Sequence, residues 1–155
     1  MLVTSAGLLL YRRRSAGTEV FLVHPGGPFW ARKDGGAWSV PKGILNPDED
    51  ELAGARREFT EETGFEIDVS ARPHDLGTFL QTRGKRLRIW ALEGDCTPAD
   101  MISNLFELEW PPKSGRVARF PEADRGDWFD QQQALRKITR SQRPVIEKFY
   151  LIVGA

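Results

Sequence analysis

Apolar positions in the N-terminal and central parts of the chain are grouped in short runs, and this grouping predicts β-strands. Residues 2–11 form a nearly continuous apolar run, and residues 19–24 form a second run close enough to pair with it as a hairpin. Residues 75–81 and 87–92 predict two more strands, joined by a basic turn around Gly84. These four segments indicate a sheet at the centre of the protein.

Later segments predict further strands and two helices. Residues 104–110 alternate with period two, which predicts a strand with one apolar face, and the segment 111–115 breaks it with two prolines. A short strand at 126–129 leads into a helix at 131–138, and residues 141–153 carry apolar side chains at helical spacing. Because strands and helices interleave without a linker, and 155 residues suit one domain, we expect a single α/β domain over residues 1–155.

The polar segment at residues 47–63 has the start and stop signals of a helix. Asn46 suits the N-cap, Pro47 suits the first helical position, and Glu49 stands where the acid of a capping box reaches back. Gly64 suits the left-handed residue that ends a helix. The stripe of this helix that we expect to be buried consists of Leu52, Ala55 and Phe59, with Thr63 beside them.

Glu51, Glu58 and Glu62 cluster on the flank of that stripe, and Glu61 lies further round on the solvent side. Glu58, Glu61 and Glu62 are spaced by three and four residues, so their carboxylates can converge on one point. Without a counter-ion, such pairs are destabilising by about 0.2–0.5 kcal/mol each. A hard divalent cation with oxygen ligands would remove the repulsion, and the alternative is a solvated acidic face. Gly54, one turn upstream, would let a phosphate or a hydrated metal approach the backbone, unless the helix merely tolerates it.

Seven residues stand at fixed spacing in the segment that ends with this helix. The pattern is Gly-x5-Glu-x7-Arg-Glu-apolar-x-Glu-Glu-x-Gly-apolar, and its fixed positions are Gly43, Glu49, Arg57, Glu58, Glu61, Glu62 and Gly64. This pattern resembles the signature box of the Nudix hydrolases. Phe59 fills a slot that is more often aliphatic in that family, a departure that affects packing more than chemistry. The resemblance implies the Nudix fold, an α/β/α sandwich with a mixed β-sheet between helices.

The resemblance also implies a reaction and a cofactor. Nudix hydrolases cleave a pyrophosphate linkage in a nucleoside diphosphate linked to another group, with Mg²⁺ or Mn²⁺, so the expected partner is a small-molecule nucleotide. By position, Glu58, Glu61 and Glu62 would ligate the metal, with the backbone carbonyl of Gly43 as an additional ligand. Arg57 would orient these carboxylates by charge-assisted hydrogen bonds. The alternative for Arg57 is an ordinary ion pair with Glu61.

The residues before the box extend the resemblance. Residues 38–43 read Trp-Ser-Val-Pro-Lys-Gly, which is similar to the W-x-x-P-K-G run of Nudix subfamilies that act on dinucleoside polyphosphates, inositol pyrophosphates and related substrates. This run predicts a short strand entering a turn. Lys42 would place a positive charge near the substrate phosphates, or else be a solvated turn residue. Trp38 is expected in the core. A nucleic-acid partner is expected only as a capped or 5′-phosphorylated RNA end.

The segment 24–36 holds four glycines and two prolines, which predicts a long loop between two strands. Phe29 and Trp30 would stack on a nucleobase, or alternatively fold back and pin the loop to the body. Arg32, with Lys33 beside it, would meet phosphates. His24 is expected to be a strand-end histidine rather than a catalyst.

A general base outside the box is a further candidate, because Nudix hydrolases differ in where the base comes from. Glu107 and Glu109 share one face of their predicted strand, and a glutamate of the box is the alternative. Glu122, Asp124 and Asp127 have less support from the sequence.

Charge and cysteine content exclude several other classes. Twenty-two basic and 22 acidic residues give a net charge of zero, so we expect no global attraction to nucleic acid or anionic membranes. The single cysteine, Cys96, excludes an internal disulfide and suits a cytoplasmic protein. No apolar run approaches the roughly 18 residues of a membrane span. The arginines at 12–14 follow the first apolar run instead of preceding it, which argues against a signal peptide.

Two other functions are compatible with the resemblance. The main alternative is a non-catalytic Nudix-fold module that binds and senses a nucleotide without cleaving it. The full set of Arg57, Glu58, Glu61 and Glu62 favours the enzyme, because a pure sensor has no need of it. An isomerase acting on an isoprenyl diphosphate would need a reactive cysteine, whereas Cys96 lies in an expected turn. The sequence names neither the substrate nor the oligomeric state.

Overall fold

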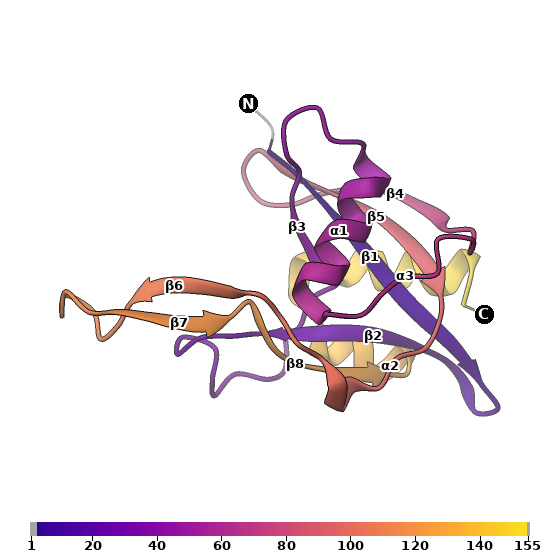
Figure 1. The fold of residues 1–155 in the computed structure, drawn as a ribbon. Coiled ribbons are helices and arrows are strands. Elements are labelled where there is room, and N and C mark those ends of the chain that lie inside the picture. The colour runs from indigo at the N-terminus through magenta and orange to yellow at the C-terminus, as the bar shows by residue number, and fades with distance from the viewer. Residues whose placement is uncertain (1–2, 155) are drawn as a thin grey trace.

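A six-stranded mixed sheet lies at the centre of the protein (Figure 1). The structure is a computed structural model that describes residues 3–154. The strand order is β4-β5-β1-β2-β8, and a short β3 also pairs with β1. The bounds are β1 (Val3–Arg14), β2 (Gly17–Pro25), β3 (Lys42–Ile44), β4 (His74–Leu80), β5 (Lys85–Glu93) and β8 (Ala123–Phe129). β1 and β5 run parallel, and the other pairs in this sheet are antiparallel.

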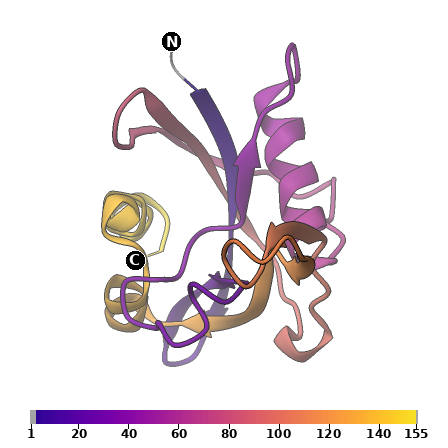
Figure 2. The ribbon, with the colours of Figure 1, turned by 90° about the vertical axis from the view of Figure 1, so that its left-hand side faces the viewer.

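Helices cover both faces of the sheet (Figure 2). Helix α1 (Glu51–Thr63) lies on one face, and α2 (Gln131–Lys137) and α3 (Arg143–Ile152) lie on the other. β1 is buried continuously from Ala6 to Tyr11, as expected for a strand covered on both faces. Its side chains alternate between two cores: Leu8 and Leu10 pack on the α1 side, and Leu9 and Tyr11 pack on the side of α2 and α3. The predicted α/β/α sandwich is confirmed.

Most predicted elements are confirmed. The two predicted hairpins are the antiparallel pairs β1–β2 and β4–β5. The first predicted strand included Leu2, which lies outside the described residues. The predicted C-terminal helices are α2 and α3, with a 3-10 turn, η2 (Arg140–Gln142), before α3. The strand predicted within residues 38–43 begins only at Lys42, although Ser39 forms an isolated bridge with Val23. Within residues 3–154, no helix is long and apolar enough to cross a membrane.

Residues 104–121 form an arm that projects from the body of the protein (Figure 1). The arm is a two-stranded sheet of β6 (Leu105–Glu109) and β7 (Val117–Pro121), preceded in the chain by a 3-10 turn, η1 (Pro98–Asp100). β6 was predicted, whereas β7 was not. β7 is short and pairs with β6 alone, so its own five residues carried too weak a pattern to indicate a strand.

Helix α1 begins four residues later than predicted. Its N-cap is Asp50, whose side chain accepts from the backbone N–H of Ala53 at 2.9 Å. Asp48 has φ of 63°, a left-handed conformation that separates the turn before it from the helix. The side chain of Glu49 does reach back to the N–H of Asn46 (3.0 Å), but it closes this turn instead of capping the helix. The predicted helix end is confirmed, because Gly64 is the C-cap with φ of 75°.

Gly54 is buried against the turn that precedes α1. A Cβ atom at Gly54 would overlap Cδ2 of Leu45 and lie 3.1 Å from the carboxyl group of Glu49. The hypothesis that Gly54 opens the backbone to a phosphate or metal is therefore wrong. The missing side chain instead lets the segment around Leu45 pack closely on α1.

We expect Gly54→Ala to lower the free energy of unfolding by up to about 2 kcal/mol. The overlap with Leu45 costs about 1–3 kcal/mol, more than the roughly 1 kcal/mol by which alanine is favoured in a helix. Urea unfolding measures the difference. Thr60→Ala, at an exposed position of the same helix, is the control and should be neutral or stabilising. A Gly54→Ala protein more stable than the wild type would contradict the packing argument.

Candidate active site

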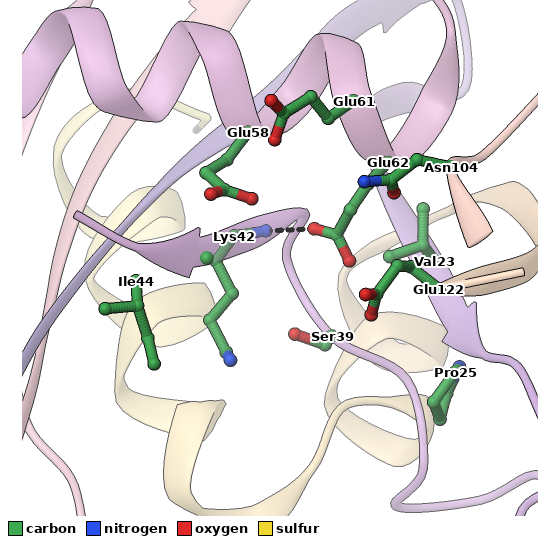
Figure 3. Close-up of a pocket in the computed structure, with 11 residues that line it drawn as sticks. Val23, Pro25, Ser39, Lys42, Ile44, Glu58, Glu61, Glu62, Asn104 and Glu122 are labelled. Atoms are coloured by element: carbon green, nitrogen blue, oxygen red, sulfur yellow. Dashed lines mark hydrogen bonds between the residues drawn. The ribbon is translucent and has the colours of Figure 1, made fainter. Parts of the chain in front are cut away.

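A cavity of about 520 Å³ lies where β3, the C-terminal half of α1 and the base of the arm meet (Figure 3). Four carboxylates, one ammonium group and one amide contribute to its wall. Its lining residues are Val23, Pro25, Ser39, Lys42, Gly43, Ile44, Glu58, Glu61, Glu62, Asn104 and Glu122. All three glutamates that the helical spacing grouped together are in this set.

β3 passes close to the side chain of Glu58 on α1. A Cβ atom at Gly43 would overlap the carboxyl group of Glu58, so any larger residue would displace either the strand or the glutamate. This contact explains physically why a glycine stands at the start of the spaced pattern. It places the backbone of Gly43 directly beside one of the three carboxylates.

Glu62 is a buried carboxyl group held by the backbone of β3. Its Oε2 accepts from the N–H of Lys42 at 2.5 Å, a contact drawn in Figure 3. Burial raises the pKa of Glu62 to about 8, although the hydrogen bond from Lys42 acts in the opposite direction. Burial also raises the pKa of Glu58, and the positive charge of Arg57 partly offsets this. Ionising both carboxylates in this cavity is therefore costly without a nearby cation.

Arg57 joins three of the glutamates. Its Nε and Nη2 donate to the two carboxylate oxygens of Glu49 at 2.8 and 2.9 Å. Its Nη1 donates to Glu58 and to Glu61, both at 2.9 Å. The hydrogen bonds from Arg57 hold the pKa of Glu49 at about 2, and those to Glu49 raise the pKa of Arg57. The guanidinium group of Arg57 therefore orients both Glu58 and Glu61 from the side of α1. It does more than form an ordinary ion pair with Glu61.

A family model described as a NUDIX domain matches residues 1–149. The chain belongs to the Nudix family. It is 29% identical to the 8-oxo-(d)GTP phosphatase of Mycolicibacterium smegmatis over 97% of its own length, and it spans 45% of the length of that relative.

Two solved structures show the same fold. One is an Ap4A hydrolase of C. elegans in a binary complex, with 23% identity and a TM-score of 0.65 over 98% of both chains. The other is the NUDIX domain of Shewanella oneidensis NrtR complexed with ADP ribose, with 14% identity and a TM-score of 0.66 over 96% of this chain and 86% of that one.

The donor set of this Nudix cavity fits a hard divalent cation. The donors are the carboxylate oxygens of Glu58, Glu61 and Glu62, which are the kind of ligand that such a cation prefers. The raised pKa values of Glu58 and Glu62 indicate that negative charge in this cavity is unfavourable unless a cation compensates it. Within residues 3–154, no group of three acidic, histidine or cysteine side chains is close enough together to hold a metal ion as it stands, so Glu58, Glu61 and Glu62 line one cavity without converging on one point. In this structure Arg57 bridges Glu58 and Glu61.

The residues proposed to bind substrate are divided between the cavity and the loop. Lys42 lines the cavity, and in Figure 3 its side chain points away from Glu58, Glu61 and Glu62. Phe29 is 58% exposed and packs edge-on against Trp110 of the arm, with ring centroids 5.4 Å apart. Trp30 is 40% exposed, and Arg32 is exposed as well. Phe29, Trp30 and Arg32 are not among the described residues that line the cavity, so their stacking and phosphate contacts stay predictions.

Buried contacts fix the second half of this loop. His24 is fully buried at the end of β2, as predicted, with Nδ1 2.8 Å from Oδ1 of Asp124 and Nε2 2.5 Å from the carbonyl oxygen of Lys33. A neutral imidazole has one N–H, so both contacts are hydrogen bonds only when the ring carries both protons. Trp38, in the core as predicted, donates its Nε1–H to Asp34 at 2.7 Å. The loop is thus held from Lys33 onward, while Phe29 and Trp30 stay accessible.

The structure places neither general-base candidate of β6 at the cavity. Glu107 pairs with Arg119 on the arm at 3.4 Å, and Glu109 accepts from the N–H of Lys113 at 2.9 Å. Glu122 lines the cavity instead. Its backbone N–H donates to the carbonyl of Asn104 (2.8 Å), so the start of β8 is held beside the start of the arm.

Sequence spacing gave no strong signal for Glu122 or Asn104. Neither belongs to a motif, and both reach the cavity through pairing between chain segments that are far from the box in sequence. The N–H of Asn104 donates to the carbonyl of Glu61 (2.9 Å), which connects the base of the arm to the end of α1. The side chains of both residues face the box glutamates in Figure 3.

Proposed function

We propose that this protein hydrolyses a pyrophosphate linkage in a nucleoside diphosphate linked to another group, with Mg²⁺ or Mn²⁺ as cofactor. The observation that carries the proposal is the cavity in which Glu58, Glu61 and Glu62 meet Lys42 beside the backbone of Gly43. The similar proteins include an 8-oxo-(d)GTP phosphatase and an Ap4A hydrolase. Their names support a nucleotide substrate for this protein.

Each residue of the cavity has its own proposed role in metal or substrate binding. Glu58, Glu61 and Glu62 would hold the metal with the carbonyl of Gly43, and Arg57 keeps Glu58 and Glu61 oriented. A bound divalent ion would supply charge neutralisation at the pyrophosphate and a source of activated water. Lys42, which lines the cavity, would add a positive charge for the phosphate oxygens. The exposed Phe29 and Trp30 would present aromatic faces to the base.

Glu122 is our candidate for the group that takes a proton from the attacking water. It is the acid outside the box that lines the cavity, and it comes from β7–β8 on the side opposite α1 (Figure 3). A positioned carboxylate can accept the proton as bond formation begins, which contributes about 10²–10⁴-fold to rate.

We expect Glu122→Gln to lower kcat by about 10²-fold or more and to remove the acidic limb of the pH–rate profile, because the amide cannot accept the proton. Steady-state kinetics across pH measures both effects. Glu107→Gln, on the arm, is the matched control and should keep wild-type kcat. An unchanged pH profile in the Glu122→Gln enzyme would contradict this assignment and would indicate that a box glutamate is the base.

A hydrolysis panel tests the proposed function. It should cover dinucleoside polyphosphates, nucleoside triphosphates including 8-oxo-dGTP, ADP-ribose, sugar nucleotides and capped RNA, each with and without Mg²⁺ or Mn²⁺. We expect metal-dependent release of a nucleoside phosphate from at least one class. Nucleotide binding without turnover in every class would instead identify the non-catalytic sensor.

A further inference from the structure

A second cavity lies on the other face of the sheet from α1. It has a volume of about 510 Å³ and lies where the end of α2, η2 and the start of α3 meet. Its lining residues are Gly36, Leu135, Arg136, Ile138, Thr139, Arg140 and Arg143. The described residues that line it do not overlap with those that line the active-site cavity, so a ligand here would be distinct from the substrate.

The charge around this cavity is one-sided. Residues 131–146 contain four basic residues and no acidic residue, although the whole chain is neutral. One of the four, Lys137, pairs with Asp34 at 2.5 Å. Within residues 3–154, Arg136, Arg140 and Arg143 pair with no carboxylate. Three arginines without a carboxylate partner therefore line one hollow.

Local contacts preorganise part of this hollow. Nη1 of Arg143 donates to the carbonyl of Leu135 at 2.9 Å, which holds this guanidinium across the cavity from α2 to α3. Thr139, which carries a hydroxyl group, is also a lining residue. Guanidinium forks and a hydroxyl donor match the oxygens of a phosphate group, and arginine binds such groups in a bidentate manner.

We propose that this cavity binds a small ligand carrying a chain of phosphate groups, separate from the substrate. Its volume falls within the range of small-molecule sites, about 300–1,000 Å³. Arg136, Arg140 and Arg143 line one hollow, which favours a compact polyphosphate over an extended nucleic-acid backbone.

Backbone hydrogen bonds connect this cavity to residues 36–39, the segment that leads into the active-site cavity. The N–H of Gly36 donates to the carbonyl of Arg136 (3.0 Å), and Trp38 exchanges backbone hydrogen bonds with Lys137 and Thr139 (2.9 and 2.7 Å). The next residue, Ser39, lines the active-site cavity. A ligand held by the arginines thus contacts the same backbone that leads into the catalytic pocket.

The test is calorimetric titration of inorganic tripolyphosphate into the protein, in metal-free buffer so that metal-bridged binding at the glutamates does not contribute. We expect saturable binding by the wild type and a Kd at least about tenfold weaker for Arg136→Gln/Arg140→Gln, because charged hydrogen bonds are lost. Arg143 is left in place because it also holds Leu135. Arg83→Gln/Arg116→Gln removes the same charge at the two exposed hairpin tips and should bind like the wild type.

Equal Kd values for the two double variants would overturn the proposal, as would the absence of saturable binding by the wild type. The result is independent of whether the protein hydrolyses nucleotides.

Discussion

Glu62→Gln is expected to lower kcat by at least about a hundredfold while leaving the fold intact. Glu62 is a proposed metal ligand, and loss of a ligating carboxylate weakens the stabilisation of transition-state charge by several kcal/mol. The amide oxygen can still accept the hydrogen bond from the N–H of Lys42, so β3 should keep its position. Glu58→Gln is expected to act in the same direction, with Gly43 still able to pack beside it.

Turnover of the best substrate from the hydrolysis panel, measured over a range of Mg²⁺ concentrations, gives the size of this effect. Circular dichroism checks that the fold is retained. Glu147→Gln, at an exposed position of α3 on the other face of the sheet, is the control and should keep wild-type kcat. Wild-type rates in both Glu58→Gln and Glu62→Gln would rule out the proposed ligand set.

The metal-free protein is expected to lose up to about 4 kcal/mol of stability between pH 5 and pH 8 through Glu62 alone. The pKa of Glu62 is raised to about 8 by burial, above its ordinary value of 4.5. Between these values the folded protein keeps the proton and the unfolded chain has lost it, so the contribution is fully present below 4.5 and is lost as pH rises through 8. The pKa of Glu49 is about 2, so its titration changes the stability of the protein only at pH values below this range.

Urea unfolding at several pH values, with and without Glu62→Gln, isolates this contribution, because every other titrating group is common to both proteins. The variant should be more stable than the wild type at pH 8 without metal and nearly equal to it at pH 5. Adding Mg²⁺ at pH 8 should stabilise the wild type more than the variant, since a ligand of the folded state raises its stability. Parallel pH curves for the two proteins would show that Glu62 is not a buried, proton-retaining carboxyl group.

Glu62→Gln thus has opposite expected effects on activity and on metal-free stability. The buried carboxylate that destabilises the folded protein at alkaline pH is the group proposed to ligate the metal. This pairing is typical of functional sites, where unfavourable local electrostatics are retained because the ligand compensates them.

The sequence by itself determined the local features of this protein. Apolar runs were sufficient for β1 and β2, because strands buried on both faces of a sheet need nearly continuous apolar side chains. β4 and β5 followed from the two strand-like segments on either side of the turn around Gly84. Gly64 marked the end of α1, because glycine adopts the left-handed conformation without strain. The fixed spacing of Arg57 and the box glutamates placed them on one side of a helix, since an α-helix repeats every 3.6 residues.

Only the tertiary structure decided which distant residues join that helix. Glu122 and Asn104 enter the cavity through backbone pairing between the arm, β8 and the end of α1, and Glu107 is carried away on the arm for the same reason. Gly54 packs against Leu45 because a turn at Asp48 folds back over the helix. The arginine-lined cavity forms where α2 and α3 meet. These contacts join residues far apart in the chain or across a turn, and a pattern of side chains along the sequence records only near neighbours.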